Sequence, residues 1–138
     1  MIVLMSQIFT YNGSERVLTS EAFLVSETDE RGIITFANDD FCEVAGYSID
    51  ELRGKPHNLV RHPDMPRAAF KDLWDTVRSG KIWTGFVKNS VKGGNGFYWV
   101  YATVFPVMRE GKRYYMSCRK KPAEDEIASA VELYKTLH

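Results

Sequence analysis

The sequence HNLVRHPDMP at residues 57–66 separates two parts of the chain that have different patterns. This run is polar and cationic, with two histidines, an arginine and an aspartate inside eight residues. Before it lie short segments broken by glycines and acidic turns. After it come an aromatic helix and a series of long apolar strands. A soluble domain needs such a dense polar group beside aromatic side chains in order to hold a charged, planar ligand.

The helix that follows is expected over residues 64–79, with Asp64 as its cap and Pro66 in its first turn. Four large apolar residues recur along it at i, i+3, i+4 and i+7 and share one face: Phe70, Leu73, Trp74 and Val77. Such a stripe usually packs into the core. Because the cationic run directly precedes it, the stripe is also a candidate wall for a ligand.

Beyond the helix the hydrophobic period changes to two, which indicates strands over residues 82–91, 97–105 and 113–119. Glycine-containing turns at 92–96 and 109–112 separate them. The middle strand is apolar on both faces, so both of its faces must be covered. One face is expected against the helices, and the other against the N-terminal cap, a partner or the final helix.

Before the cationic run, residues 22–26 and 33–38 are expected to form a β-hairpin, with a polar turn at 28–32. A short helix over 39–44 follows, and Ser48 with Glu51 has the spacing of a capping box for another. A final helix is expected over residues 123–137. Two strands, short helices and three further strands predict an α+β domain with a five-stranded antiparallel sheet and helices packed on one face.

The 138 residues fit one domain. Lys+Arg and Asp+Glu both number 18, which argues against non-specific nucleic-acid binding. The charges are uneven, since residues 21–51 carry nine acids and one base, whereas residues 52–92 carry nine bases and three acids. The positive middle would attract an anionic ligand such as a pyrophosphate.

Two cysteines, Cys42 and Cys118, lie far apart without zinc-ligand spacing, so we expect neither a disulfide nor a metal site. Free cysteines are typical of proteins in a reducing compartment, so we expect this chain in the cytoplasm. No apolar run approaches membrane-spanning length, which predicts no direct membrane insertion. The chain shows no Ser/His/Asp or Cys/His set and no phosphate-binding glycine loop. We therefore expect no catalytic residues and no enzyme activity.

Several motifs together resemble the PAS sensor of Aer-type aerotaxis receptors, over about residues 20–137. They are ANDDF at 37–41, GY at 46–47, EL at 51–52, GKPHN at 54–58, RHPDMP at 61–66, AF at 69–70, Trp74, WTG at 83–85, VKN at 87–89 and YWV at 98–100. The short pieces are common to many PAS domains, whereas the unbroken run at 57–66 is strongly specific. The resemblance implies a PAS fold with an N-terminal cap at 1–20, a sensor domain at 21–121 and a C-terminal signalling helix at 122–138.

The resemblance also implies non-covalent binding of FAD and a report of its redox state to a chemotaxis receptor or transducer, or to a HAMP-like segment, with a homodimer as a further option. It implies nine cofactor-binding residues: Asn38, His57, Arg61, His62, Asp64, Phe70, Trp74, Trp83 and Asn89. The chain departs from the family pattern in the glycine-rich hairpin at 90–97, where Phe97 stands in place of a common histidine.

The residue chemistry agrees with this implied role. Arginine offers a planar fork of donors to phosphate oxygens, and tryptophan gives a flat face for a ring system. Asparagine presents a donor and an acceptor, which suits the polar edge of a flavin. Asp64 has the competing role of a helix cap, and His62 that of a loop histidine bonded to the backbone.

Three alternatives remain open. A haem-binding gas sensor would use His57 or His62 as the axial ligand, although the long helix contains no histidine. A cofactor-free dimerisation module would need none of the polar residues for binding. A light sensor that forms a cysteine adduct is disfavoured, because neither Cys42 nor Cys118 lies in the helix that usually carries the reactive cysteine.

Overall fold

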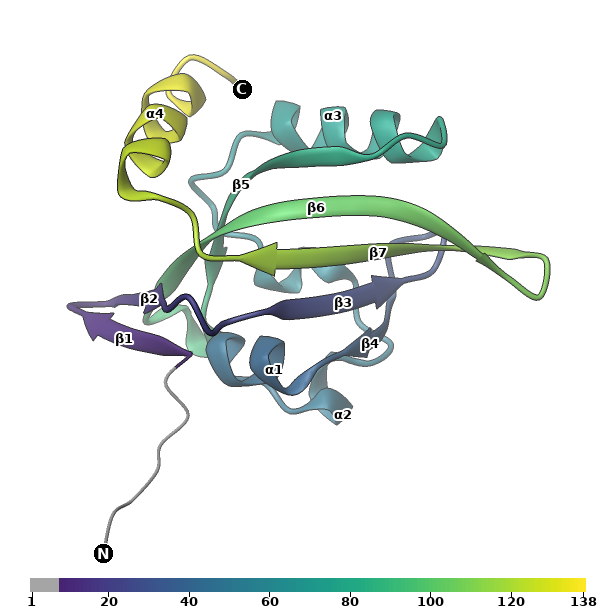
Figure 1. Cartoon of the computed structure of the whole chain (residues 1–138), viewed down its shortest axis with the longest axis horizontal. Coiled ribbons are helices and arrows are strands. Elements are labelled where there is room, and N and C mark those ends of the chain that lie inside the picture. Colours follow the sequence, from purple (N-terminus) through teal and green to yellow (C-terminus); the bar gives the residue numbers. More distant parts are fainter. Residues whose placement is uncertain (1–7) are drawn as a thin grey trace, which may run out of the picture.

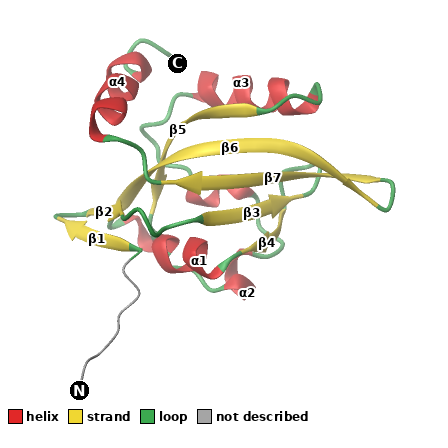
Figure 2. Ribbon diagram, in the orientation of Figure 1, coloured by secondary structure: helices red, strands yellow, loops and turns green. Residues whose placement is uncertain are grey.

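The computed structural model describes residues 8–138, which form a curved sheet flanked by helices (Figures 1 and 2). The strands are β1 Phe9–Asn12, β2 Glu15–Leu18, β3 Leu24–Thr28, β4 Ile34–Ala37, β5 Trp83–Ser90, β6 Phe97–Arg109 and β7 Lys112–Lys120. The helices are α1 Asp39–Ala45, α2 Ile49–Leu52, α3 Arg67–Arg78 and α4 Glu124–Tyr134, with 3-10 turns η1 His57–Val60 and η2 Lys92–Gly94. The predicted α+β class is confirmed.

The five predicted strands form one antiparallel sheet in the order β5-β6-β7-β3-β4. The N-terminal cap adds two strands that the sequence analysis did not predict. β1 and β2 make a hairpin, and Glu15 of β2 pairs in parallel with Phe97 at the start of β6. Gly13, with a φ of 61°, allows the tight turn between them. The remainder of the predicted cap, residues 1–7, lies outside the described residues.

The two short helices form where the sequence predicted them, and each has a side-chain cap at its start. Asn38 caps α1 by accepting a hydrogen bond from the backbone N–H of Phe41, and Gly46 ends it with a φ of 84°. The capping box at the start of α2 is confirmed, because Ser48 and Glu51 each bind the other's backbone N–H. These caps fix the tight path of the chain between β4 and the cationic run.

The long helix begins later than predicted, at Arg67, and Asp64 does not cap it. Its N-cap is Pro66, which makes no side-chain capping bond and has an extended ψ of 142°. A residue before proline is sterically pushed out of the helical region, so Met65 cannot belong to the first turn. Residues 62–66 therefore form a loop that leads into α3.

The core lies between the sheet and helices α1 to α3. The side chains of Phe41, Leu52, Val60 and Val77 are almost completely buried there. On the opposite face of β6, Trp99 stacks on Tyr134 of α4, with ring centroids 6.5 Å apart. The final helix thus covers part of the second face of this strand, which is one of the three covers that the sequence predicted. It stands beside α3 and β5 in Figure 1.

Candidate functional site

A cavity of about 190 Å³ lies between α3, η1 and the inner face of the sheet. Its walls come from most of the domain: Ser26, Thr28, Arg31, Gly32, Pro56, His57, Asn58, Arg61, Phe70, Leu73, Trp74, Arg78, Val87, Asn89, Val104, Tyr115, Ser117 and Arg119. Four of these residues are arginines, and within residues 8–138 the cavity wall includes neither aspartate nor glutamate. The cavity is therefore a strongly electropositive site.

Five of the nine residues predicted from the sequence meet in this cavity, namely His57, Arg61, Phe70, Trp74 and Asn89. The other four lie elsewhere. Asn38 is occupied at the start of α1, where its side chain also binds the backbone of Val25 and Phe23. Trp83 is buried and donates its indole N–H to Asp72, 2.9 Å away, beside a different cleft under α4.

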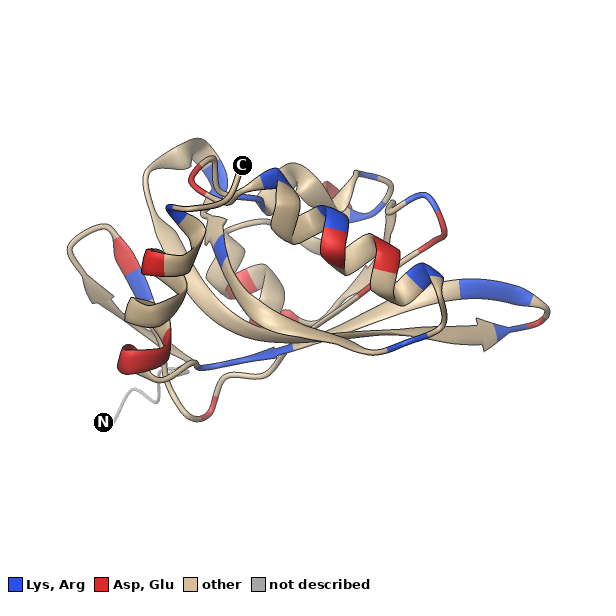
Figure 3. Ribbon diagram, turned by 90° about the horizontal axis from the view of Figure 1, so that it is seen from above, with Lys and Arg blue, Asp and Glu red and all other residues tan. Residues whose placement is uncertain are grey.

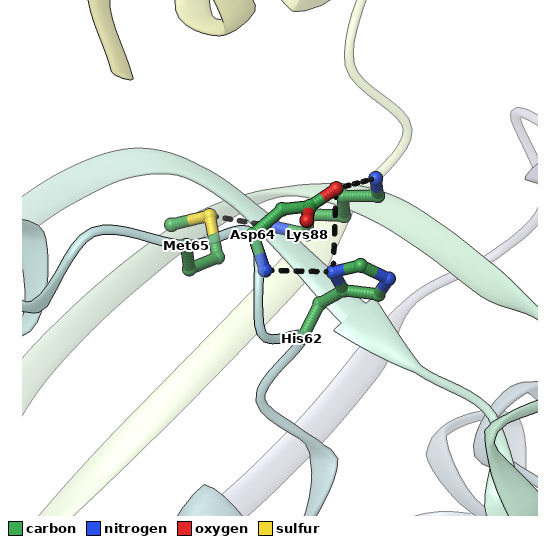
Figure 4. Close-up of polar contacts among 4 residues, drawn as sticks. All are labelled: His62, Asp64, Met65 and Lys88. Atoms are coloured by element: carbon green, nitrogen blue, oxygen red, sulfur yellow. Dashed lines mark hydrogen bonds and ion pairs between the residues drawn. The ribbon is translucent and has the colours of Figure 1, made fainter. Parts of the chain in front are cut away.

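His62 and Asp64 lie outside the cavity wall, against the side chain of Lys88 (Figure 4). The Lys88 ammonium donates to Asp64 at 2.8 Å, and His62 Nδ1 accepts the backbone N–H of Asp64 at 3.0 Å. The hydrogen bond from Lys88 lowers the pKa of Asp64. The backbone N–H of Lys88 donates to the sulfur of Met65. These contacts fasten the loop before α3 to strand β5.

Arg119 is the cavity residue of greatest interest that the sequence analysis did not select. It is only 6% exposed, and its Nε donates to the Ser117 hydroxyl at 2.8 Å. The Asn89 amide, oriented to satisfy both neighbours, donates to Val60 O at 3.1 Å and accepts from Arg119 Nη1 at 2.9 Å. Burial lowers the pKa of Arg119. No carboxylate in the described part of the chain forms an ion pair with this guanidinium.

Arg61 supplies a second cation inside the cavity. Its guanidinium carbon lies 3.7 Å from the centre of the Phe70 ring, in a cation–π contact. Its Nε is buried and finds no hydrogen-bond partner within residues 8–138. The backbones of Arg61 and Asn89 form an isolated antiparallel pair, so the two side chains enter the cavity from adjacent points. A buried donor without a partner is costly, and a ligand acceptor would satisfy it.

His57 is held neutral in the cavity. Its Nε2 lies 3.0 Å from the Ser26 hydroxyl, and its ring meets Phe41 edge-on. Burial, together with the charges of Arg119 and Arg61, lowers the pKa of His57 to about 3. A neutral imidazole has one donor and one acceptor nitrogen and adds no charge to the site.

Residues 34–119 match the family described as the PAS fold. The chain belongs to this family. This PAS domain is 50% identical, over 122 residues, to the aerotaxis receptor of Escherichia coli (strain K12). The matched region covers 88% of this chain and 24% of the receptor. It is 33% identical, over 84 residues, to the nitrogen fixation regulatory protein of Klebsiella pneumoniae, covering 61% of this chain and 17% of that protein. The PAS domain thus spans about a quarter, or less, of these relatives' length.

Among solved structures, this PAS domain is similar to a light-oxygen-voltage domain studied with a flavin analogue, with a TM-score of 0.67 and 19% identity over 82% of this chain and 85% of the other. At this identity the likeness shows the fold alone. The resemblance to Aer-type PAS sensors, which rests on several motifs over about residues 20–137, is confirmed, and the chain is a PAS sensor domain. Within residues 8–138 no helix is long and apolar enough to cross a membrane.

Proposed function

We propose that this PAS domain binds FAD without a covalent link and reports its redox state, for aerotaxis, to a chemotaxis receptor or transducer. The observation that carries the proposal is the unpaired positive charge inside the cavity. Among residues 8–138, Arg119 is buried without an ion pair to a carboxylate, and the buried Arg61 Nε has no acceptor. The carbonyl oxygens and ring nitrogens of a flavin would accept hydrogen bonds from both groups.

The remaining cavity residues suit the ring system of a flavin. Phe70 and Trp74 offer aromatic surface from α3, and Leu73 and Val87 offer apolar contacts. Asn89, His57 and Ser26 supply donors and acceptors for a polar ring edge. The cavity is smaller than the roughly 300–1,000 Å³ that usually encloses a whole ligand. Part of the dinucleotide would therefore be held inside, and the rest at the mouth.

The similarity to the aerotaxis receptor, which is 50% identical over 122 residues, supports the same proposal. We assign direct contact with FAD to His57, Arg61, Phe70, Trp74, Asn89 and Arg119. Asn38, His62, Asp64 and Trp83 would instead support the elements that position these six.

Asn89 is the residue through which the cavity would communicate with the surface. A bound flavin would supply electron transfer, together with a ring edge whose hydrogen-bonding capacity changes on reduction. The Asn89 amide bridges Val60 and Arg119, so a new hydrogen bond on the ligand side competes with both. Its backbone pairs with Arg61, and its neighbour Lys88 holds Asp64 on the other side of β5. A rotation of this amide would thus displace the strand and the loop before α3 together.

A haem-binding sensor is a weaker alternative. Of the two histidines proposed as axial ligands, only His57 lines the cavity, and its Nε2 is engaged by Ser26. His62 faces Asp64 and Lys88 instead. Haem ligation through His57 would require the hydrogen bond to Ser26 to break and the ring to turn within a packed wall.

The test is the absorption spectrum of the purified domain before and after incubation with FAD, followed by heat release and chromatography of the chromophore. Two flavin bands and release of FAD are expected. Arg61→Ala and Trp74→Ala should lose the colour, whereas Arg67→Ala, an exposed change on the same helix, should retain it. A Soret band would show that the domain binds haem and would contradict the proposal. A domain that takes up neither cofactor would leave protein interaction as its function.

A further inference from the structure

Two arginines that the aerotaxis proposal does not use stand where the cavity opens. Arg31 lies in the turn between β3 and β4, and Arg78 is the last residue of α3. Both border the cavity and both are exposed. They come from elements far apart in the sequence, so their meeting at one mouth is a property of the fold.

Trp74 lies close to both segments that carry these arginines. The Arg78 guanidinium carbon lies 4.8 Å from the centre of the Trp74 ring. The turn that carries Arg31 packs close to the same indole at Gly32, where an added Cβ would lie 3.2 Å from Trp74 Cζ2. Gly32 has a φ of 82°, which a residue with a side chain adopts only at a cost. The glycine thus allows the turn to approach the tryptophan.

Neither guanidinium is neutralised by a strong partner. Arg31 lies 3.5 Å from Asp29, but its side chain is 81% exposed, and such surface pairs contribute little. The Oδ1 atom of Asp29 accepts the backbone N–H groups of Arg31 and Ile33, so only Oδ2 faces the Arg31 guanidinium. The Arg78 guanidinium forms no ion pair within the described part of the chain, and the Arg78 backbone carbonyl accepts a hydrogen bond from a further cation, Arg113.

We propose that Arg31 and Arg78 bind the diphosphate of the dinucleotide, and so make this domain select FAD over flavins that lack a diphosphate. This inference rests on the proposed function. A diphosphate carries a negative charge on each phosphate, and two exposed, planar guanidinium groups that border the same cavity can bind both. The small interior, with its own cations Arg61 and Arg119, receives the ring system, which leaves the diphosphate outside at the mouth.

The experiment compares the dissociation constants of FAD, FMN and riboflavin for the apo domain by fluorescence titration. The wild type is expected to bind FAD most tightly and riboflavin least. Arg31→Gln and Arg78→Gln should each weaken FAD binding roughly tenfold and leave riboflavin binding unchanged. FAD binding should weaken with added salt in the wild type, and less so in the double variant. Arg67→Gln removes the same charge from α3 away from the cavity and should alter none of the three constants.

The outcomes separate the two proposals. If the wild type binds FAD but the double variant retains the same ratio of FAD to riboflavin affinity, the diphosphate role of the two arginines is wrong and FAD binding stands. If riboflavin binding falls as much as FAD binding, the arginines shape the cavity instead of selecting the dinucleotide. If the wild type binds no flavin, both proposals are wrong.

Discussion

At the scale of single residues, His57 makes the stability of the domain depend on pH. Its pKa falls from 6.5 to about 3 in the folded state, so the unfolded chain binds a proton first as the pH falls. Stability should therefore decrease between about pH 6.5 and 3, by up to about 1.4 kcal/mol per pH unit from this group alone. Urea unfolding of the apo domain at several pH values measures this slope. His57→Gln should reduce it, and identical slopes would show that burial does not hold His57 neutral.

Arg119 should favour ligand binding at the expense of apo stability. Its charge is buried without a carboxylate, so removing it relieves an uncompensated cost of dehydration. We expect Arg119→Met to leave the free energy of unfolding of the apo domain unchanged or raise it by about 1 kcal/mol. The same change should weaken FAD binding at least tenfold. Lys120→Met, an exposed change on the same strand, should affect neither. A strong loss of apo stability in Arg119→Met would contradict this account.

Residue patterns predicted part of the cavity for a physical reason. Phe70 and Trp74 share a helix face with core residues, so their inward orientation follows from the period of 3.6. Arg119 belongs to a strand where apolar and polar residues mix, and a cation there is usually exposed. Its inward orientation depends on which face of β7 the helices cover. The pairing of β7 with β3 and β6 determines that face. His62 and Asp64 follow Arg61 directly, but the loop turns them toward Lys88.

At the scale of elements, the loop before α3 is fastened to β5 by the pair Asp64 and Lys88. Lys88 is 16% exposed and Asp64 68%, so solvent weakens the pair on one side. We expect Asp64→Asn to lower the free energy of unfolding by about 0.5–1 kcal/mol. It should also weaken FAD binding, because the loop carries Arg61. The loss should vanish in acid, since Asp64 has a lowered pKa and its contribution disappears as the pH falls through that value.

Denaturant midpoints and FAD titrations of Asp64→Asn and of Lys88→Met measure this fastening. Asp75→Asn is the matched control, because it breaks a fully surface pair with Lys71 on α3. A role of Asp64 as a direct FAD contact would lower affinity without any change in apo stability. That result would return Asp64 to the binding residues implied by the family resemblance.

The predicted and the observed elements differ where contacts between distant parts of the chain determine the structure. Helices with their own caps, such as α1 and α2, are local and follow from the sequence. The hairpin of β1 and β2 consists of four-residue strands with only Leu18 buried, so its pattern is weak. It joins the sheet through a single parallel pair, between Glu15 and Phe97. Nothing in the local sequence specifies that contact.

At the scale of the whole molecule, we propose that α4 transmits a change in the cavity to the surface. Its first turn is acidic, with Glu124, Asp125 and Glu126 (Figure 3). Few contacts hold it to the domain. Tyr134 stacks on Trp99 and donates its hydroxyl to Phe86 O of β5 at 2.5 Å. The backbone N–H of Ala68 donates to His138 O beyond the end of the helix. An element with so few contacts is expected to detach more easily than the core.

Two substitutions separate the contacts of Tyr134. Tyr134→Phe removes the hydrogen bond to β5 and retains the stack, whereas Tyr134→Ala removes both. We expect amide exchange of α4 to accelerate roughly tenfold in Tyr134→Phe and further in Tyr134→Ala. FAD affinity should stay unchanged, since Tyr134 lies outside the cavity wall. Equal exchange in all three proteins would mean that other contacts, such as the buried Ala130, hold the helix.

The proposed connection from the cavity to α4 runs along β5 and can be tested as a whole. Asn89 lies in the cavity wall and Phe86 receives the Tyr134 hydroxyl, so one strand carries both ends of the route. If reduction of bound FAD turns the Asn89 amide, β5 shifts and the hold on α4 changes. Amide exchange of α4 should then differ between the oxidised and reduced forms of the wild type, while α1 exchanges equally in both.

Asn89→Leu, shown by absorption to retain FAD, should abolish the difference, because leucine cannot exchange one hydrogen-bond partner for another. A difference that persists in Asn89→Leu would place the route through another wall of the cavity, with Arg119 on β7 the first to be substituted.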